Sequence, residues 1–387
     1  MRITPVKRLL VLAVFGLFSF TNVMAQNTVK LPYKVLANKM IVEVSINGKL
    51  VPMIFDTGGK NAMDSKLRES LGLSATHTRD VIDVSRSKKS MDVVTVNNLT
   101  IAKGKMAFKN VPFLVIDTEF FPCLDRARGL IGSDLWQNHT IEIDDQKKVI
   151  TITEGGSSAM LNHPKAIPFL ENGGGAPLFS VKVGDFDQAR VVFDSGADGF
   201  LSLRQTDYPR LESQGALFMI REGASTGSIG VNGRGPNGRR ILLEIPELTI
   251  SGGKFSKLRI GVGSALESLF GYQLLNFGKV TIDYVNQKFL FEPFPAFSTE
   301  KIENTKKYWD LELRPENQQM VVSSVWDKLK GEVELGDVVT HINGKKITQF
   351  SYCENLTNEL PELIGQDKLI FRLQTKTGVK EVTVIKE

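Results

Sequence analysis

The 387-residue sequence has few of the residues that build disulfide frameworks and metal centres. It contains only two cysteines, Cys123 and Cys353, in regions that we expect to belong to different domains. A disulfide framework is therefore not predicted, although export would permit one. The four histidines are scattered without paired spacing, so we predict no metal site.

The sequence also has no apolar run long enough to span a membrane. Arg2, Lys7 and Arg8 precede an apolar run over residues 9–20, and small residues follow it. That run is about a dozen residues, whereas a spanning helix needs roughly 20. The pattern predicts a secretory signal peptide over residues 1–25, cut before Gln26, in preference to an uncleaved anchor.

Charge of one sign is not in strong excess either. The formal net charge is +5, and removing the three positive charges of residues 1–25 leaves +2. We therefore expect no nucleic-acid partner. Contact with a membrane is expected only transiently, through the signal peptide. The mature protein is expected in the periplasm or outside the cell.

Two copies of one short motif are the most informative feature that is present. Asp56-Thr57-Gly58 and Asp194-Ser195-Gly196 each follow an apolar segment, and their aspartates lie 138 positions apart. Leu130-Ile131-Gly132 and Leu269-Phe270-Gly271 then end 76 and 77 residues after the respective aspartate. Two copies in one register predict a duplicated unit with one carboxylate in each half.

The segments before each motif are typical of β-strands. Residues 40–46 and 50–55 are rich in β-forming residues and are joined by Asn47-Gly48, which is typical of a hairpin turn. Residues 178–183 and 189–193 repeat this order before the second aspartate. Polar, glycine-rich residues follow the first unit, and prolines follow the second. We therefore predict one unit over residues 31–155, a second over 165–295 and a third over 305–387.

Paired aspartates suit the hydrolysis of an amide bond. The reaction needs a base to activate water and an acid to protonate the leaving nitrogen. Two carboxylates about 3 Å apart cannot both ionise, so one shared proton makes the pair a base and an acid at once. Asp56 and Asp194 are the candidate catalytic residues, acting as a unit.

The neighbouring residues have supporting roles in this hypothesis. Gly58 and Gly196 permit a tight turn and close backbone approach. Thr57 and Ser195 offer hydroxyls that can hydrogen-bond between the two loops. The two apolar-apolar-glycine segments are expected to pack beneath the loops and hold them rigid.

These motifs resemble those of clan AA aspartic proteases, the retropepsin and pepsin-like group, over roughly residues 31–293. The resemblance implies a mostly β, bilobal fold with two retropepsin-like β-barrel lobes and an active cleft between them. It also implies an aspartic endopeptidase that hydrolyses peptides or proteins without a cofactor. The shared proton is an established property of that family.

The third unit differs in character. Gly336-Asp337, Ile342-Asn343-Gly344 and a helix candidate over residues 352–364, followed by a hairpin, resemble a PDZ domain. The resemblance implies a small α+β domain that binds a substrate or partner peptide by strand addition, with residues 320–325 as the edge strand. Residues 314–319 lack the glycine-rich pattern that binds a free C-terminal carboxylate.

Two departures from the family pattern bear on activity. Gly59-Lys60 follows the first motif where Ala197-Asp198 conforms in the second. Lys60 either lowers the pKa of the aspartate pair or points into solvent. Between Thr76 and Asn110, where a flap should fall, there is no tyrosine, and the candidate tip at residues 85–90 is basic. In the second half, residues 223–238 are a candidate glycine-rich lid.

Two other readings of the motifs stay open. The tripeptides could be tight turns in a duplicated β protein without chemistry. Alternatively, the protein could keep the fold and bind peptides as a catalytically inactive protein. Lys60 and the absent flap tyrosine favour the inactive peptide-binding alternative, whereas the shared register and the downstream glycines count against simple tight turns.

Overall fold

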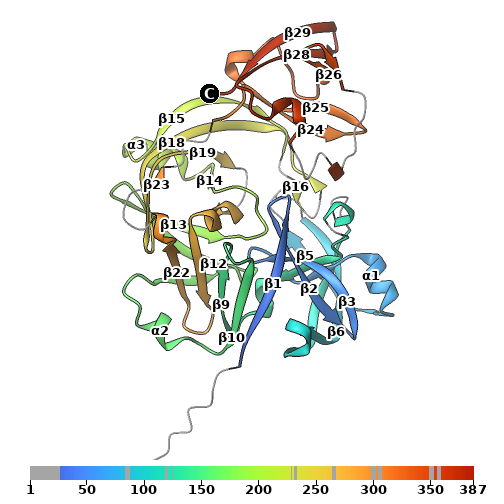
Figure 1. The fold of residues 1–387 in the computed structure, drawn as a ribbon, viewed down its shortest axis with the longest axis vertical. Helices are drawn as coiled ribbons and strands as arrows, with labels where there is room; N and C mark the ends of the chain where they lie inside the picture. Colours follow the sequence, from blue (N-terminus) through green and yellow to red (C-terminus); the bar gives the residue numbers. More distant parts are fainter. Residues whose placement is uncertain are drawn as a thin grey trace, which may run out of the picture.

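The computed structural model describes residues 27–82, 88–117, 121–124, 126–227, 229–230, 233–263, 267–297, 302–303, 307–347, 353–354 and 359–387. The protein is mostly β, as the sequence predicts (Figure 1). The predicted signal peptide lies outside the described residues. Within the described ranges, no helix combines the length and the apolar character that crossing a membrane requires.

Local sequence signals account for many of the strands and turns. β2 (Lys39–Ile46) and β3 (Lys49–Asp56) form the predicted hairpin, and Asn47 and Gly48 between them take positive φ angles of 49° and 88°. Left-handed residues of this kind match the twist of paired strands. The short helix α1 (Ser65–Ser70) follows the first motif, and the Asp64 side chain caps it by accepting a hydrogen bond from the Leu67 N–H.

The first half of the chain forms a closed ring of paired strands, which we call the first ring. β3 ends at Asp56, and β6 (Lys88–Ile101) pairs with β2 to close the ring. A further strand, β5 (Ala75–Ile82), extends β6. The ring strands, in order of pairing, are β2, β3, β8 (Gly129–Gly132), β4 (Ala62–Met63), β7 (Met106–Val115) and β6 (Lys88–Ile101).

The second half forms a ring with the same order of pairing, which we call the second ring. β13 (Phe186–Phe193) leads into Asp194, and β15 (Phe218–Ser225) extends β18 (Gly238–Ile250) as β5 extends β6. The strands are β12 (Pro177–Val183), β13 (Phe186–Phe193), β20 (Ser268–Phe270), β14 (Leu201–Arg204), β19 (Gly253–Gly263) and β18 (Gly238–Ile250). Along the chain, α3 (Tyr208–Ser213) lies between β14 and β15, and β16 (Ile229–Gly230) and β17 (Gly233–Arg234) lie between β15 and β18. The 3₁₀ turn η4 (Tyr272–Asn276) follows β20.

A sheet shared by both halves joins the two rings. β9 (His139–Asp144) and β21 (Gly278–Asp283) pair at its centre, where Ile141 lies opposite Ile282 and both are fully buried. One continuous hydrophobic cluster includes side chains from this sheet and from both rings. In order, the strands are β1 (Thr28–Leu36), β10 (Val149–Glu154), β9 (His139–Asp144), β21 (Gly278–Asp283), β22 (Lys288–Pro293) and β11 (Ile167–Glu171). The helix α2 (Ser158–Leu161) lies between β10 and β11.

Residues 307–387, which we call the C-terminal region, have a separate hydrophobic cluster. The strands are β24 (Leu311–Glu316), β25 (Gln319–Trp326), β26 (Val338–Ile342), β27 (Lys345–Lys346), β28 (Lys368–Thr375) and β29 (Gly378–Ile385). The helix predicted over residues 352–364 lies partly outside the described residues, and its described part includes the 3₁₀ turn η7 (Pro361–Leu363).

The edge strand predicted in this region is not an edge. β25 pairs with β24 on one side. On its other side it pairs with β26 at Met320 and Val321 and with β15 from Ser324 to Trp326. The prediction that residues 320–325 accept a peptide by strand addition is therefore wrong, because strands of this chain already fill both sides.

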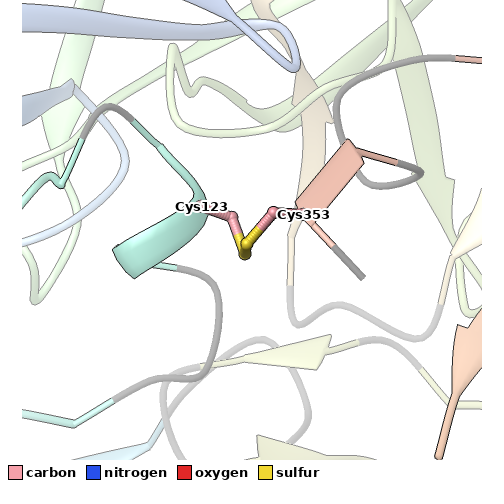
Figure 2. Close-up of a disulfide and its surroundings, with 2 residues drawn as sticks. All are labelled: Cys123 and Cys353. Carbon is pink, nitrogen blue, oxygen red and sulfur yellow. A yellow bond between two sulfur atoms is a disulfide. The ribbon is translucent and has the colours of Figure 1, made fainter. Parts of the chain in front are cut away.

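The expectation that the two cysteines stay apart is also wrong. Cys123, in η2 (Phe121–Cys123) of the first half, forms a disulfide with Cys353 of the C-terminal region across 230 positions (Figure 2). The two cysteines do lie in separately predicted units. That observation did not exclude a bond, because folding brings the units together.

Candidate active site

The two aspartates occupy equivalent positions at strand ends. Asp56 is the last residue of β3, and Asp194 follows β13 directly. In each loop the carboxylate accepts a hydrogen bond from the N–H of the glycine two residues on, at 2.9 Å for Gly58 and 2.8 Å for Gly196. These bonds fix each carboxylate against its own loop. We call residues 56–59 and 194–197 the first and second aspartate loops.

Reciprocal hydrogen bonds join the two loops through Thr57 and Ser195. The Thr57 N–H donates to the Ser195 hydroxyl at 3.0 Å, and the Ser195 N–H donates to the Thr57 hydroxyl at 2.9 Å. Each hydroxyl also donates to a carbonyl of the opposite strand, Phe193 or Phe55, at 2.9 Å. Both side chains are fully buried, so these bonds are shielded from water.

The glycines show how closely the loops approach. A Cβ atom built on Gly58 would overlap the Asp194 carboxyl, and one built on Gly196 would lie 2.5 Å from Asp56 Cγ. Each glycine therefore packs against the aspartate of the other loop. This contact places the two carboxyl groups together where the rings meet, and it leaves no room for a side chain at either glycine.

The predicted supporting segments lie directly beside the aspartate strands. β8 runs parallel to β3, with Leu130 opposite Ile54 and Gly132 opposite Asp56, and β20 runs parallel to β13 with Leu269 opposite Val192. Ile131 and Phe270 are fully buried. A Cβ atom on Gly132 or Gly271 would overlap backbone of the adjoining loop. These segments therefore limit the positions that the aspartate loops can take.

The surroundings of Asp194 disfavour its ionised form. Burial, the negative charge of Asp56 and a hydrogen bond with the Asp56 carboxyl together raise the pKa of Asp194 to about 8. The positive charge of Lys39 and the Gly196 N–H act in the opposite direction. Because the two carboxyls interact strongly, the retained proton belongs to the pair.

The cation that acts on Asp194 is Lys39 rather than Lys60. Lys60 is half-buried, and its pKa is lowered first by burial, with Asp134, Arg79 and Glu171 as the charged neighbours. It is not among the groups that shift the pKa of Asp194. Lys39 lies at the start of β2, and no motif in the sequence marks it.

Residues 42–135 match the family model described as aspartyl protease. The matched segment contains the first aspartate loop and β8, and it ends before the second aspartate loop. The match supports a peptidase. No curated protein matches the chain.

Other predicted features fall partly outside the described residues. Residues 85–87 of the candidate flap tip are not described, while Lys88 in the same tip forms an ion pair with Asp80 at 2.8 Å. In the candidate lid, Gly223, Ala224 and Ser225 pair with both β18 and β25. Among the described residues, no cluster of three or more His, Cys, Asp or Glu could hold a metal ion.

Proposed function

We propose that the protein is an aspartic-type endopeptidase in which Asp56 and Asp194 jointly activate water to hydrolyse peptide bonds. The observation that carries this proposal is the packing of Gly58 against the Asp194 carboxyl and of Gly196 against the Asp56 carboxyl. With one proton on the pair, one carboxylate can take a proton from water while the other carboxyl protonates the leaving nitrogen. The match to an aspartyl protease family supports the same chemistry.

The proposed architecture is a pair of lobes, residues 31–155 and 165–295, followed by a PDZ-like domain over 305–387. The identical order of strand pairing in the two rings supports duplicated, retropepsin-like lobes. The separate hydrophobic cluster supports an independent third domain. A peptide ligand of this domain would have to pair with a strand other than β25.

We also propose that the protein is exported and acts in the periplasm or outside the cell. The disulfide between Cys123 and Cys353 supports this placement, because disulfides persist mainly in oxidising compartments. The apolar run near the N-terminus supports a signal peptide.

Cleavage of a peptide library from acid to neutral pH tests the activity. Asp56→Ala and Asp194→Ala should each lower kcat/KM by about 100-fold or more, because either change removes half of the acid–base pair. Asp185→Ala, in the exposed turn between β12 and β13, is the matched control and should retain full activity. Cleavage that survives both active-site changes would refute the proposal.

Lys39 gives the inactive alternative a specific basis, since a cation beside the pair favours loss of the shared proton. If the unchanged protein cleaves no peptide at any pH but binds peptides from the same library, it is a peptide-binding protein of this fold. Isothermal titration with library peptides distinguishes the two outcomes.

A further inference from the structure

Lys39 reaches from the first half of the chain to the second aspartate loop. It follows Ala37 and Asn38, whose positive φ angles of 50° and 57° make the tight turn between β1 and β2. Its ammonium group donates a hydrogen bond to the Gly196 carbonyl and forms an ion pair with Asp198. The Lys39 side chain is 19% exposed and that of Asp198 is 60% exposed, so the lysine is the more buried partner.

The second half has no matching cation. Its equivalent turn, residues 172–176 between β11 and β12, is Asn-Gly-Gly-Gly-Ala. A Cβ atom on Gly174 would lie 3.9 Å from the Gly58 carbonyl, so this turn approaches the first aspartate loop as the Lys39 turn approaches the second. Two equivalent turns therefore flank the aspartate pair, and only one of them carries a positive charge.

We propose that Lys39 is a positioning residue of the aspartate pair, whose ammonium group holds the second aspartate loop against the first half and favours the ionised form of the pair. The inference rests on the proposed function and adds a residue to it. It assigns to Lys39 the effect on the charge state of the aspartate pair that the sequence suggested for Lys60.

The charges around the pair account for this role. Burial and the Asp56 carboxylate oppose ionisation of Asp194, and Lys39 is the cation that offsets them. Asp198 also faces Lys39 and partly neutralises its charge. Because Asp198 is the more exposed partner, water screens its charge more than that of the lysine. The Lys39–Asp198 pair therefore acts on Asp194 with a net positive charge, which offsets part of the effect of burial and of Asp56.

Two substitutions that break the same ion pair separate charge from structure. Lys39→Met keeps the length and apolar stem of the side chain but removes the charge, so the pH at which activity is lost on the alkaline side should rise by about one unit. Asp198→Asn leaves the lysine charge unopposed and removes a nearby negative charge, so the same limb should move to lower pH. A purely structural ion pair predicts shifts of the same sign for both variants.

The experiment measures kcat/KM against pH for a fluorogenic peptide selected from the library. Lys39→Arg, which keeps the charge, should leave the alkaline limb in place, and Lys60→Gln is the matched control that should do the same. Circular dichroism checks that each variant is folded. Shifts of the same sign in Lys39→Met and Asp198→Asn, or no shift in Lys39→Met, would overturn the proposal.

A second readout separates this proposal from the proposed function. Carbon-13 NMR titration of aspartate carboxyls, assigned with Asp56→Asn and Asp194→Asn, should show the same opposite shifts without any need for turnover. Opposite NMR shifts without cleavage would leave the role of Lys39 intact and refute the endopeptidase. Cleavage combined with unshifted carboxyl titrations would retain the endopeptidase and refute the role of Lys39.

Discussion

The glycines beside the two aspartates affect the stability of the protein through the pKa of Asp194. Gly58 and Gly196 bring the two carboxyls together because neither has a side chain to separate them. Burial and the nearby charge of Asp56 raise the pKa of Asp194 above its value in an unfolded chain. The folded state therefore holds a proton that the unfolded chain releases at lower pH, and the stability of the protein becomes dependent on pH.

The sign of this dependence follows from the raised pKa. The contribution of Asp194 to stability is complete below about pH 4 and is lost as the pH rises toward 8. Asp194→Asn removes the ionisable group and with it this loss of stability. The melting temperature of the variant minus that of the unchanged protein should therefore increase by several degrees between pH 4 and 8. Differential scanning calorimetry at several pH values measures it.

Asp185→Asn, in the exposed turn between β12 and β13, is the control for that comparison. Its melting temperature should equal that of the unchanged protein at every pH. If the curves for Asp194→Asn and the unchanged protein run parallel from pH 4 to 8, the folded protein does not hold the extra proton at Asp194.

Among the elements, β15 determines how the C-terminal region attaches. It pairs with β18 on one side and with β25 on the other, so one sheet continues from the second ring into the C-terminal region (Figure 1). Trp326 is 1% exposed, and the guanidinium carbons of Arg221 and Arg240 lie over its ring, 4.8 and 4.7 Å from the ring centroid. Such cation–π contacts are stronger where water is excluded.

Gly223 is the residue that permits this attachment. A Cβ atom there would overlap the Val325 carbonyl and lie 2.7 Å from Trp326 Cα. We expect Gly223→Ala to push β15 from β25 and to destabilise the protein by about 1–3 kcal/mol, the usual cost of overpacking. Urea denaturation measures the change, and limited proteolysis should release the C-terminal region sooner.

Gly238→Ala is the matched control for this element, because a Cβ atom at Gly238 in β18 would contact nothing within 4 Å. Equal denaturation midpoints for the Gly223 and Gly238 variants would show that β15 and β25 do not pack closely in solution.

In the whole molecule, the C-terminal region is attached to both halves of the chain. It joins the second half through β15 and the first half through the disulfide, while the shared sheet joins the two halves directly. It is therefore held at two separate points, which limits its movement relative to the aspartate pair. The disulfide closes a loop of 230 positions, and loops of this length constrain the unfolded chain strongly.

Removing the disulfide tests this arrangement. The double change Cys123→Ser and Cys353→Ser should lower the free energy of unfolding by about 2–4 kcal/mol. Urea denaturation with and without a thiol reductant measures it. Reductant should shift the midpoint of the unchanged protein and leave that of the double variant in place. Equal midpoints for the unchanged protein in both conditions would contradict a stabilising bond.

Local patterns predicted the β class and the hairpin turn at Asn47-Gly48 because the signals lie within a few residues of one another. Asn47 and Gly48 take the positive φ angles that a two-residue hairpin turn requires, and the Asp64 side chain caps α1 from three residues away. The repeated motif also predicted the residues of the candidate site. Duplication leaves the same pattern twice, so the pattern itself indicates which residues become neighbours.

The remaining features depend on contacts between residues that no shared pattern connects. Lys39 reaches Gly196 across 157 positions, and Cys123 reaches Cys353 across 230, from segments without sequence similarity. Whether β25 is an edge strand likewise depends on a distant contact, because β15 pairs with its otherwise open side. The sequence thus names the two aspartates and their loops, since repetition is readable along the chain. Only the folded structure shows that Lys39 lies beside them, because charges interact through space and the positions of Lys39 and Gly196 along the chain do not give the distance between them.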